Sequence, residues 1–405
     1  MPTTIYLDHA ATTPVRPEVR EAMLPFLGEA AFGNPSSAHR AGRAVRAAVE
    51  AARERVAAAV GAEPREVVFT SGGTEADNLA ILGTAAAAAP GGDWSRLHLV
   101  SSPTEHKAVL GALHEAGRLG ARVTLLPVDR SGVVDLTALE EALAGKLPGG
   151  RPTLVSVMWV NNEVGTLQPV AAIGERCRAA GVPFHSDAVQ ALGKVPVDLR
   201  AVPASLLAIS AHKVEGSKGC GALVVRGTAA PHPLIHGGGQ QGGVRPGTEN
   251  VPGLVGFGAA AELAAAEQPV RTGALAMLRD ALEAMLVAAV PDAVVHGAAG
   301  PRGPAILNLS APGTDSEAML MHLDLAGVAA ASGSACTTGS VEPSHVLEAM
   351  RVPRPLALAA VRFSFGALSR PQDAPQVAER YAAAVAKVRE LRAALARGRD
   401  LGDLR

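Results

Sequence analysis

The chain has 405 residues, of which 48% are hydrophobic and 19% charged, and a formal net charge of −1. This composition is typical of a packed soluble protein rather than of a disordered chain. The balanced charge, without a long run of one sign, argues against an electrostatic nucleic-acid binder. Because no apolar stretch reaches membrane-spanning length and no secretory signal pattern opens the chain, we expect no membrane association.

Helical and strand-like patterns alternate through the first part of the chain. Residues 42–61 predict an amphipathic helix with valines on one face and a stop at Gly61. Short apolar segments then predict strands at residues 67–70, 97–100, 122–126, 154–159, 182–185, 206–210 and 221–225. Strands that alternate with helices predict a mostly parallel, seven-stranded α/β sheet with helices on both faces.

The pattern changes near residue 252. Two Ala-rich helices are predicted around residues 258–266 and 275–290, followed by a short strand at 306–309. The chain then ends in a long helix whose apolar residues lie near one face: Val377, Tyr381, Val385, Val388 and Leu395. These elements predict a second, smaller α+β lobe.

The length likewise favours two domains, or one large domain with a smaller lobe. We expect a large cofactor-binding α/β domain over residues 15–255. Residues 1–14 and 256–405 are expected to form the small α+β domain.

The most informative stretch is the predicted strand 206–210, which ends in Ser210, Ala211, His212 and Lys213. Ligands bind at the carboxyl ends of strands in open α/β sheets. A partly desolvated lysine there can attack a carbonyl, and the flanking Ser and His can hold a phosphate. Pyridoxal 5′-phosphate (PLP) carries both an aldehyde and a phosphate. The simpler alternative is a surface lysine after an edge strand.

Other predicted strands also end in polar clusters. Gly73 and Thr74 lie at a strand-to-helix turn suited to an anion, although an ordinary helix cap has the same pattern. His106 could stack on a ligand or move a proton. Asp187 is costly to bury without a cationic partner such as a protonated pyridine nitrogen, unless it caps a helix. Together these clusters predict a cofactor enzyme with a reactive lysine.

Motifs spread over nearly the whole chain resemble the cysteine desulfurases, PLP enzymes of aminotransferase fold type I. The resemblance is strongest to the nitrogen-fixation and iron–sulfur-assembly branch. The matching segments stand in the family's order at residues 6–14, 33–37, 70–75, 104–107, 161–163, 185–190, 210–213, 245–250, 332–336 and 361–364.

The resemblance implies a role for each matching residue around PLP. Lys213 would form the Schiff base, Asp187 would pair with the pyridinium nitrogen, and Gln190 would donate to the ring hydroxyl. His106 would stack on the ring and act in proton transfer. The implied phosphate contacts are Gly73, Thr74, Ser210, His212 and, from the other subunit of a homodimer, Thr248.

The resemblance also implies a substrate site for L-cysteine. Asn162 would lie between cofactor and substrate, while Asn34 and Arg362 would hold the substrate carboxylate, to which a planar guanidinium is well matched. Cys336 would accept the sulfur. Its small, polar neighbours favour a mobile, exposed loop, which suits that role.

The other two cysteines, Cys177 and Cys220, sit beside apolar sequence and are expected to be buried. The three cysteines lie far apart and match no zinc spacing, so we expect no metal site and a cytoplasmic location.

The implied reaction converts L-cysteine to L-alanine and leaves a persulfide on Cys336, which would supply an iron–sulfur scaffold or another sulfur acceptor. Three alternatives stay open. A selenocysteine lyase of the same fold would use the same residues. A class-V aminotransferase would have no use for a mobile cysteine. A catalytically silent scaffold would be expected to have lost some of the residues that bind the cofactor, and none of these residues is missing.

The chain departs from the family pattern at two places. Gln241 and Gly242 stand where the family usually has an acidic and then a larger residue. Ser217 stands where a proline is common. Neither change removes an implied catalytic group, so both bear on loop rigidity and partner contacts.

Overall fold

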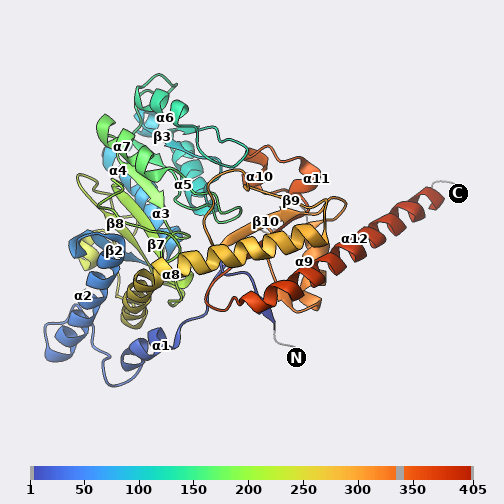
Figure 1. Cartoon of the computed structure of the whole chain (residues 1–405). Helices are drawn as coiled ribbons and strands as arrows, with labels where there is room; N and C mark the ends of the chain where they lie inside the picture. The colour runs from blue at the N-terminus through green and yellow to red at the C-terminus, as the bar shows by residue number, and fades with distance from the viewer. Residues whose placement is uncertain (1–3, 334–341, 403–405) are drawn as a thin grey trace.

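The computed structural model describes residues 4–333 and 342–402 (Figure 1). Its centre is a seven-stranded sheet in the order β2-β8-β7-β6-β5-β3-β4. The strands are β2 (Val67–Thr70), β3 (His98–Ser101), β4 (Arg122–Leu125), β5 (Leu154–Ser156), β6 (Phe184–Asp187), β7 (Leu206–Ser210) and β8 (Gly221–Val225). β8 is antiparallel to both its neighbours, and the other pairs are parallel. The predicted mostly parallel sheet is confirmed.

Strand β5 is shorter than the predicted segment 154–159. It ends at Ser156, where its neighbour β3 also ends at Ser101. Two residues on, the Met158 N–H donates to the Glu105 carboxyl group at 2.9 Å rather than to a strand.

Helices cover both faces of this sheet, as predicted. Alternate residues of β7 face opposite cores: Leu206 and Ala208 face one, and Leu207 and Ile209 face the other. The covering helices are α2 (Arg40–Val60), α3 (Gly73–Asn78), α4 (Thr84–Ala88), α5 (Lys107–Arg118), α6 (Leu136–Leu143) and α7 (Val170–Ala180). Helix α2 ends at Gly61 with a φ of 68°, a left-handed conformation that glycine adopts without strain.

A second core surrounds a small antiparallel sheet in the order β12-β10-β9. Its strands are β9 (Val294–Val295), β10 (Ile306–Ser310) and β12 (Ala360–Ser364), and a separate parallel pair joins β1 (Ile5–Tyr6) to β11 (Val328–Ala329). The remaining helices are α1 (Pro17–Met23), α8 (Val251–Ala289), α9 (Ser316–Leu325), α10 (His345–Ala349), α11 (Arg354–Ala357) and α12 (Ala374–Gly402).

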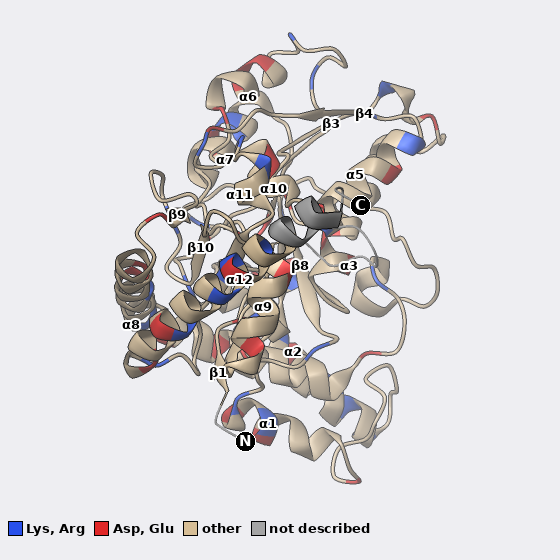
Figure 2. Cartoon of the chain, turned by 90° about the vertical axis from the view of Figure 1, so that its right-hand side faces the viewer, with Lys and Arg blue, Asp and Glu red and all other residues tan. Residues whose placement is uncertain are grey.

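Helix α12 packs on the second core and then extends away from the body of the molecule (Figure 1). Tyr381, Val385 and Val388 are buried as predicted, but Leu395 is 64% exposed because it lies on the extending part. Figure 2 shows basic and acidic residues intermixed along the ribbon of α12. Among the described residues, no helix is both long and apolar enough to cross a membrane.

The prediction of two helices around residues 258–266 and 275–290 is wrong, because α8 is one helix with Pro269 inside it. A proline inside a helix costs about 3 kcal/mol. Burial at both ends offsets this cost: Phe257 packs in the core of the large sheet, and Leu282 packs in the second core. The predicted boundary between residues 255 and 256 falls within α8, and the division into two domains stays a prediction.

Candidate active site

The carboxyl ends of the parallel strands surround a cavity of about 260 Å³. Its lining consists of Ala10, Gly73, Thr74, Asp77, His106, Met158, Asn162, Asp187, Val189, Gln190, Ser210, His212 and Lys213. The structure therefore brings together every residue predicted to contact the cofactor except Thr248.

Lys213 reaches this cavity from the short 3₁₀ turn Ala211–Lys213 that follows β7. Its Nζ donates hydrogen bonds to the carbonyl oxygens of Ala10 and Ala11, both at 2.6 Å. Burial, with a contribution from Arg362, lowers the pKa of Lys213 to about 8. A larger share of this amine is thus neutral and nucleophilic near neutral pH than for an exposed lysine.

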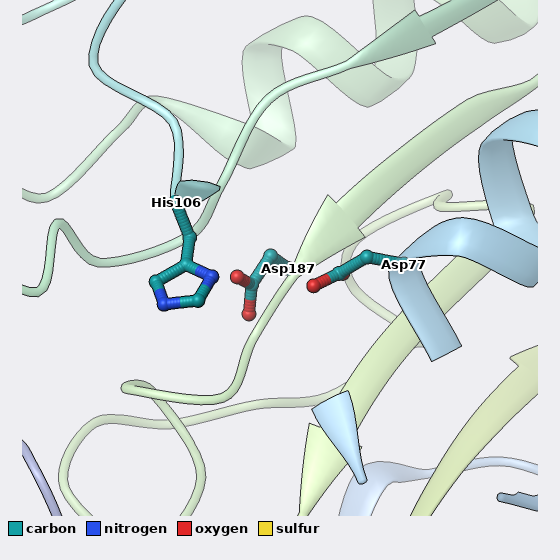
Figure 3. A group of neighbouring side chains, drawn as sticks. All are labelled: Asp77, His106 and Asp187. Carbon is teal, nitrogen blue, oxygen red and sulfur yellow. The ribbon is translucent and has the colours of Figure 1, made fainter. Parts of the chain in front are cut away.

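Three titratable side chains of the cavity lining gather in one cluster. Figure 3 shows the Asp187 carboxyl group between the His106 ring and Asp77, and their nearest polar atoms lie within 4.8 Å of one another. Burial raises the pKa of Asp187, and burial and the charge of Asp187 raise that of Asp77 well above its usual value. A cationic ring nitrogen beside Asp187 would offset the cost of ionising it. This acidic pocket therefore fits a pyridinium ring.

His106 precedes helix α5, and its Nδ1 accepts a hydrogen bond from the Ala108 N–H at 3.2 Å. In the neutral ring the proton then belongs on Nε2. Loss of hydration around the ring lowers the pKa of His106; the charge of Asp187 opposes this shift and the charge of Lys213 adds to it. A neutral His106 can stack on an aromatic ring or hold a proton at Nε2.

The other end of the cavity fits an anion. A Cβ atom on Gly73 would lie 2.8 Å from Cγ2 of Val189, so only glycine fits there without displacement. The same Cβ would lie 3.7 Å from Cβ of Ser210, so the start of α3 passes close to the Ser210 side chain. Burial, with the nearby Lys213, lowers the pKa of His212 to about 4, so its imidazole is neutral. Backbone N–H groups, hydroxyls and a neutral imidazole form a suitable phosphate cradle.

Gln190 lies between the cavity and a buried lysine that sequence reasoning missed. Its Nε2 donates to the Ala10 carbonyl oxygen at 2.8 Å, and its Oε1 accepts from Nζ of Lys194 at 3.2 Å. Burial lowers the pKa of Lys194 to about 7. The four-residue spacing of Gln190 and Lys194 would bring the two side chains together on a helix. The sequence predicts no helix over these residues, so the spacing gave no usable signal.

Arg362 of β12 lies beside Asn162. Its Nη2 donates to Oδ1 of Asp8 at 2.7 Å and its Nη1 to the Asn162 carbonyl oxygen at 2.9 Å. Its Nε is buried and has no hydrogen-bond partner among the described residues. The guanidinium is thus held against Asn162, a residue of the cavity wall.

Asn34 and Thr248 do not line the cavity in this single chain. Asn34 is exposed, and its Oδ1 accepts a hydrogen bond from the Ser36 N–H at 2.8 Å, which stabilises a local turn. The predicted clamp of Asn34 and Arg362 on the substrate carboxylate stays a prediction. Thr248 is exposed on the segment before α8, and its predicted contact across a dimer stays a prediction.

Cys177 and Cys220 are free and buried, as expected. Burial raises the pKa of Cys177 to about 12 and also raises that of Cys220, so both thiols stay protonated near neutral pH. Cys336 lies outside the described residues.

Comparison with known proteins agrees with this geometry. The family model for aminotransferase class-V matches residues 5–377. This chain belongs to the class-V aminotransferase family. Class-V aminotransferases depend on PLP, and PLP is the cofactor of this chain. The acidic pocket at Asp187, the lysine at 213 and the cradle at Gly73 would hold its ring nitrogen, aldehyde and phosphate.

Several relatives within this class-V family are cysteine desulfurases. The chain is 45% identical over 369 residues to cysteine desulfurase IscS of Dictyoglomus turgidum, covering 91% of each protein. It is 48% identical over 362 residues to a cysteine desulfurase of Cereibacter sphaeroides, covering 89% of this chain and 90% of the relative. A solved NifS-like protein superposes with a TM-score of 0.83 at 34% identity, covering 96% of this chain and 99% of that one.

Proposed function

We propose that this protein is a PLP-dependent cysteine desulfurase that converts L-cysteine to L-alanine and collects the sulfur as a persulfide on Cys336. The observation that carries the proposal is the single cavity in which Lys213, Asp187 and His106 meet, with Arg362 beside it. The desulfurase relatives support this activity over the other reactions of the family.

Binding and proton transfer fall to residues of the cavity. Arg362, whose guanidinium lies beside Asn162 of the cavity wall, holds the substrate carboxylate. Asp187 stays ionised against the cationic ring and keeps that ring protonated. PLP supplies the electron sink for the bond-breaking steps. Lys213, with a pKa lowered to about 8, takes the Cα proton.

Sulfur transfer falls to Cys336. Its thiolate attacks the substrate sulfur, an S–S bond forms, and the Cβ–S bond breaks. The electron pair of the broken bond stays with carbon, which takes up a proton, so one L-cysteine and one thiol give one L-alanine and one persulfide. The persulfide then passes to an iron–sulfur scaffold or another sulfur acceptor.

The same proposal includes the assembly and organisation of the protein. Two copies form a homodimer in which Thr248 of one copy contacts the phosphate held by the other. Residues 15–255 form the PLP-binding domain, and residues 1–14 with 256–405 form the small domain. The free thiols of Cys177 and Cys220 support a reducing compartment, the cytoplasm.

The test is a turnover assay with L-cysteine in the presence of a thiol reductant. We expect equimolar alanine and sulfide, and one extra sulfur on Cys336 by mass spectrometry before the reductant is added. A keto acid formed from L-cysteine would contradict the proposal and favour an aminotransferase. Turnover of L-selenocysteine but not L-cysteine would favour a selenocysteine lyase.

A further inference from the structure

Both flanks of the segment that carries Cys336 converge on one buried side chain. Residues 334–341 lie outside the described part of the chain, but Gly333 and Ser344, close to its two ends, are described. Each of these residues lies against the carboxyl group of Glu163. Glu163 follows Asn162, so it connects the cavity wall to these flanks.

The backbone of Glu163 is held in place on both sides. Its N–H donates to Oδ1 of Asn161 at 2.9 Å, and its carbonyl oxygen accepts from Nδ2 of Asn308 at 3.1 Å. The residue is 2% exposed. Because its backbone is held and its side chain is buried, the carboxyl group of Glu163 has few alternative positions and can hold its neighbours in place.

The flank that follows the segment is attached to Glu163 through Ser344. The Ser344 hydroxyl donates to Oε2 of Glu163 and accepts from the Val346 N–H at 3.1 Å, where it caps helix α10. The next residue, His345, forms a hydrogen bond from Nε2 to the carbonyl oxygen of Glu105 at 2.9 Å. The start of α10 is thereby fixed next to the residue that precedes His106.

The flank that precedes the segment packs against the same carboxyl group. A Cβ atom on Gly333 would lie 2.8 Å from Cδ of Glu163 and closer still to its Oε2. Two residues earlier, Ala331 and Arg362 exchange backbone hydrogen bonds of 3.1 and 2.6 Å. This flank is therefore paired through its backbone with Arg362, whose guanidinium is proposed to hold the substrate.

We propose that Glu163 is a positioning residue for sulfur transfer, because it fixes both flanks of the Cys336 segment relative to Asn162 and Arg362. This inference rests on the proposed function. It separates the two halves of the reaction: Glu163 acts on the approach of the Cys336 thiol, whereas Lys213 and Asp187 act on the Cα proton. Misplacing a reacting group by about 1 Å can cost roughly 100-fold in rate.

The experiment compares Glu163→Ala with Glu163→Gln in the PLP-loaded full chain. One readout is deuterium exchange at Cα of L-cysteine, and the other is the single-turnover rate of persulfide formation on Cys336. We expect Glu163→Ala to keep the cofactor absorbance and the exchange rate but to slow persulfide formation roughly 10–100-fold. Glu163→Gln retains an acceptor for the Ser344 hydroxyl and should restore most of the rate.

Gly333→Ala provides a second variant that keeps Glu163. The new Cβ would collide with the carboxyl group, so persulfide formation should slow while exchange stays unchanged. In the double variant with Glu163→Ala the space is free, and adding the methyl group should cost much less than it does in the wild type. Such non-additivity is the mark of direct contact. If Glu163→Ala does not bind PLP, the single variant Gly333→Ala tests the role of Glu163 by itself.

Three results would overturn the inference. They are an unchanged persulfide rate in Glu163→Ala and Gly333→Ala, an equal loss of exchange and persulfide formation, or additive effects in the double variant. If the wild-type enzyme itself formed no persulfide on Cys336, the proposed function would fail, and the inference with it. The wild-type measurement therefore distinguishes the two failures.

Discussion

Lys194 donates a hydrogen bond from its buried side-chain nitrogen to Oε1 of Gln190 at 3.2 Å. With its oxygen held by Lys194, the Gln190 amide presents Nε2 to the Ala10 carbonyl oxygen at the cavity wall. Burial lowers the pKa of Lys194, and the nearby positive charges of Lys213 and Arg271 lower it further. The charge of Glu215 opposes this shift.

The first prediction concerns stability and pH. The pKa of Lys194 is about 7 in the folded protein, below the ordinary value of about 10.4 that the unfolded chain retains. Between these values the unfolded chain holds the proton and the folded protein does not, so the stability should rise with pH above 7. One such proton contributes up to about 1.4 kcal/mol per pH unit. Lys213, at about 8, acts with the same sign.

Urea denaturation of the PLP-free protein at pH 7, 8 and 9 would measure this slope. In Lys194→Met the slope should be smaller, because one of the two buried amines is gone. Lys218→Met removes an exposed amine and serves as the control. If Lys194→Met and Lys218→Met gave the same slope as the wild type, Lys194 would not be a buried amine of this kind.

The second prediction concerns the phosphate cradle. In Gly73→Ala the added Cβ would lie 2.8 Å from Cγ2 of Val189, and overpacking of this kind costs about 1–3 kcal/mol. PLP should therefore bind roughly 5- to 150-fold more weakly, as measured by titration of the PLP-free protein. The double variant Gly73→Ala with Val189→Ala removes the obstructing methyl group and should regain much of the affinity. Failure of this rescue would mean that the backbone, not Val189, limits the space.

The third prediction concerns the substrate carboxylate. Arg362→Lys keeps the charge but loses the planar pair of donors, so L-cysteine should bind more weakly by about 1.5–3 kcal/mol. The loss should be visible as a raised KM for L-cysteine with little change in PLP affinity. Because Arg362 also bonds Asp8, a parallel Asp8→Asn variant tests whether that ion pair matters for orientation. An unchanged KM in Arg362→Lys would assign the carboxylate to another residue.

Sequence reasoning located the cavity because its signals are local. A buried strand has a recognisable pattern, and polar residues such as Ser210 and Asp187 at strand ends meet at one edge of a parallel sheet. Pairings between distant segments gave no such signal. Nothing in the sequence placed Gly333 and Ser344 against Glu163, or showed the turn in which Asn34 accepts a hydrogen bond from Ser36.

Helix α8 shows a different limit of sequence reasoning. Pro269 is a strong local signal for a break, and the two Ala-rich stretches on either side of it predict separate helices. Each end of α8 packs in a different core, at Phe257 and at Leu282, and this tertiary burial overrides the local preference. Such an override depends on both cores, so a local pattern cannot reveal it.

The last prediction concerns the choice of thiol. Cys336→Ser is nearly isosteric, but its hydroxyl is not ionised near neutral pH and is a poor sulfur acceptor. The variant should bind PLP and exchange the Cα proton of L-cysteine, yet release no alanine and carry no extra sulfur. Cys177→Ser should remain active, because burial raises the pKa of Cys177 to about 12 and removes it from nucleophilic chemistry. Mass spectrometry after a pulse of L-cysteine identifies the labelled thiol. Added sulfur on Cys177 or Cys220, or full turnover by Cys336→Ser, would point instead to direct elimination of sulfide.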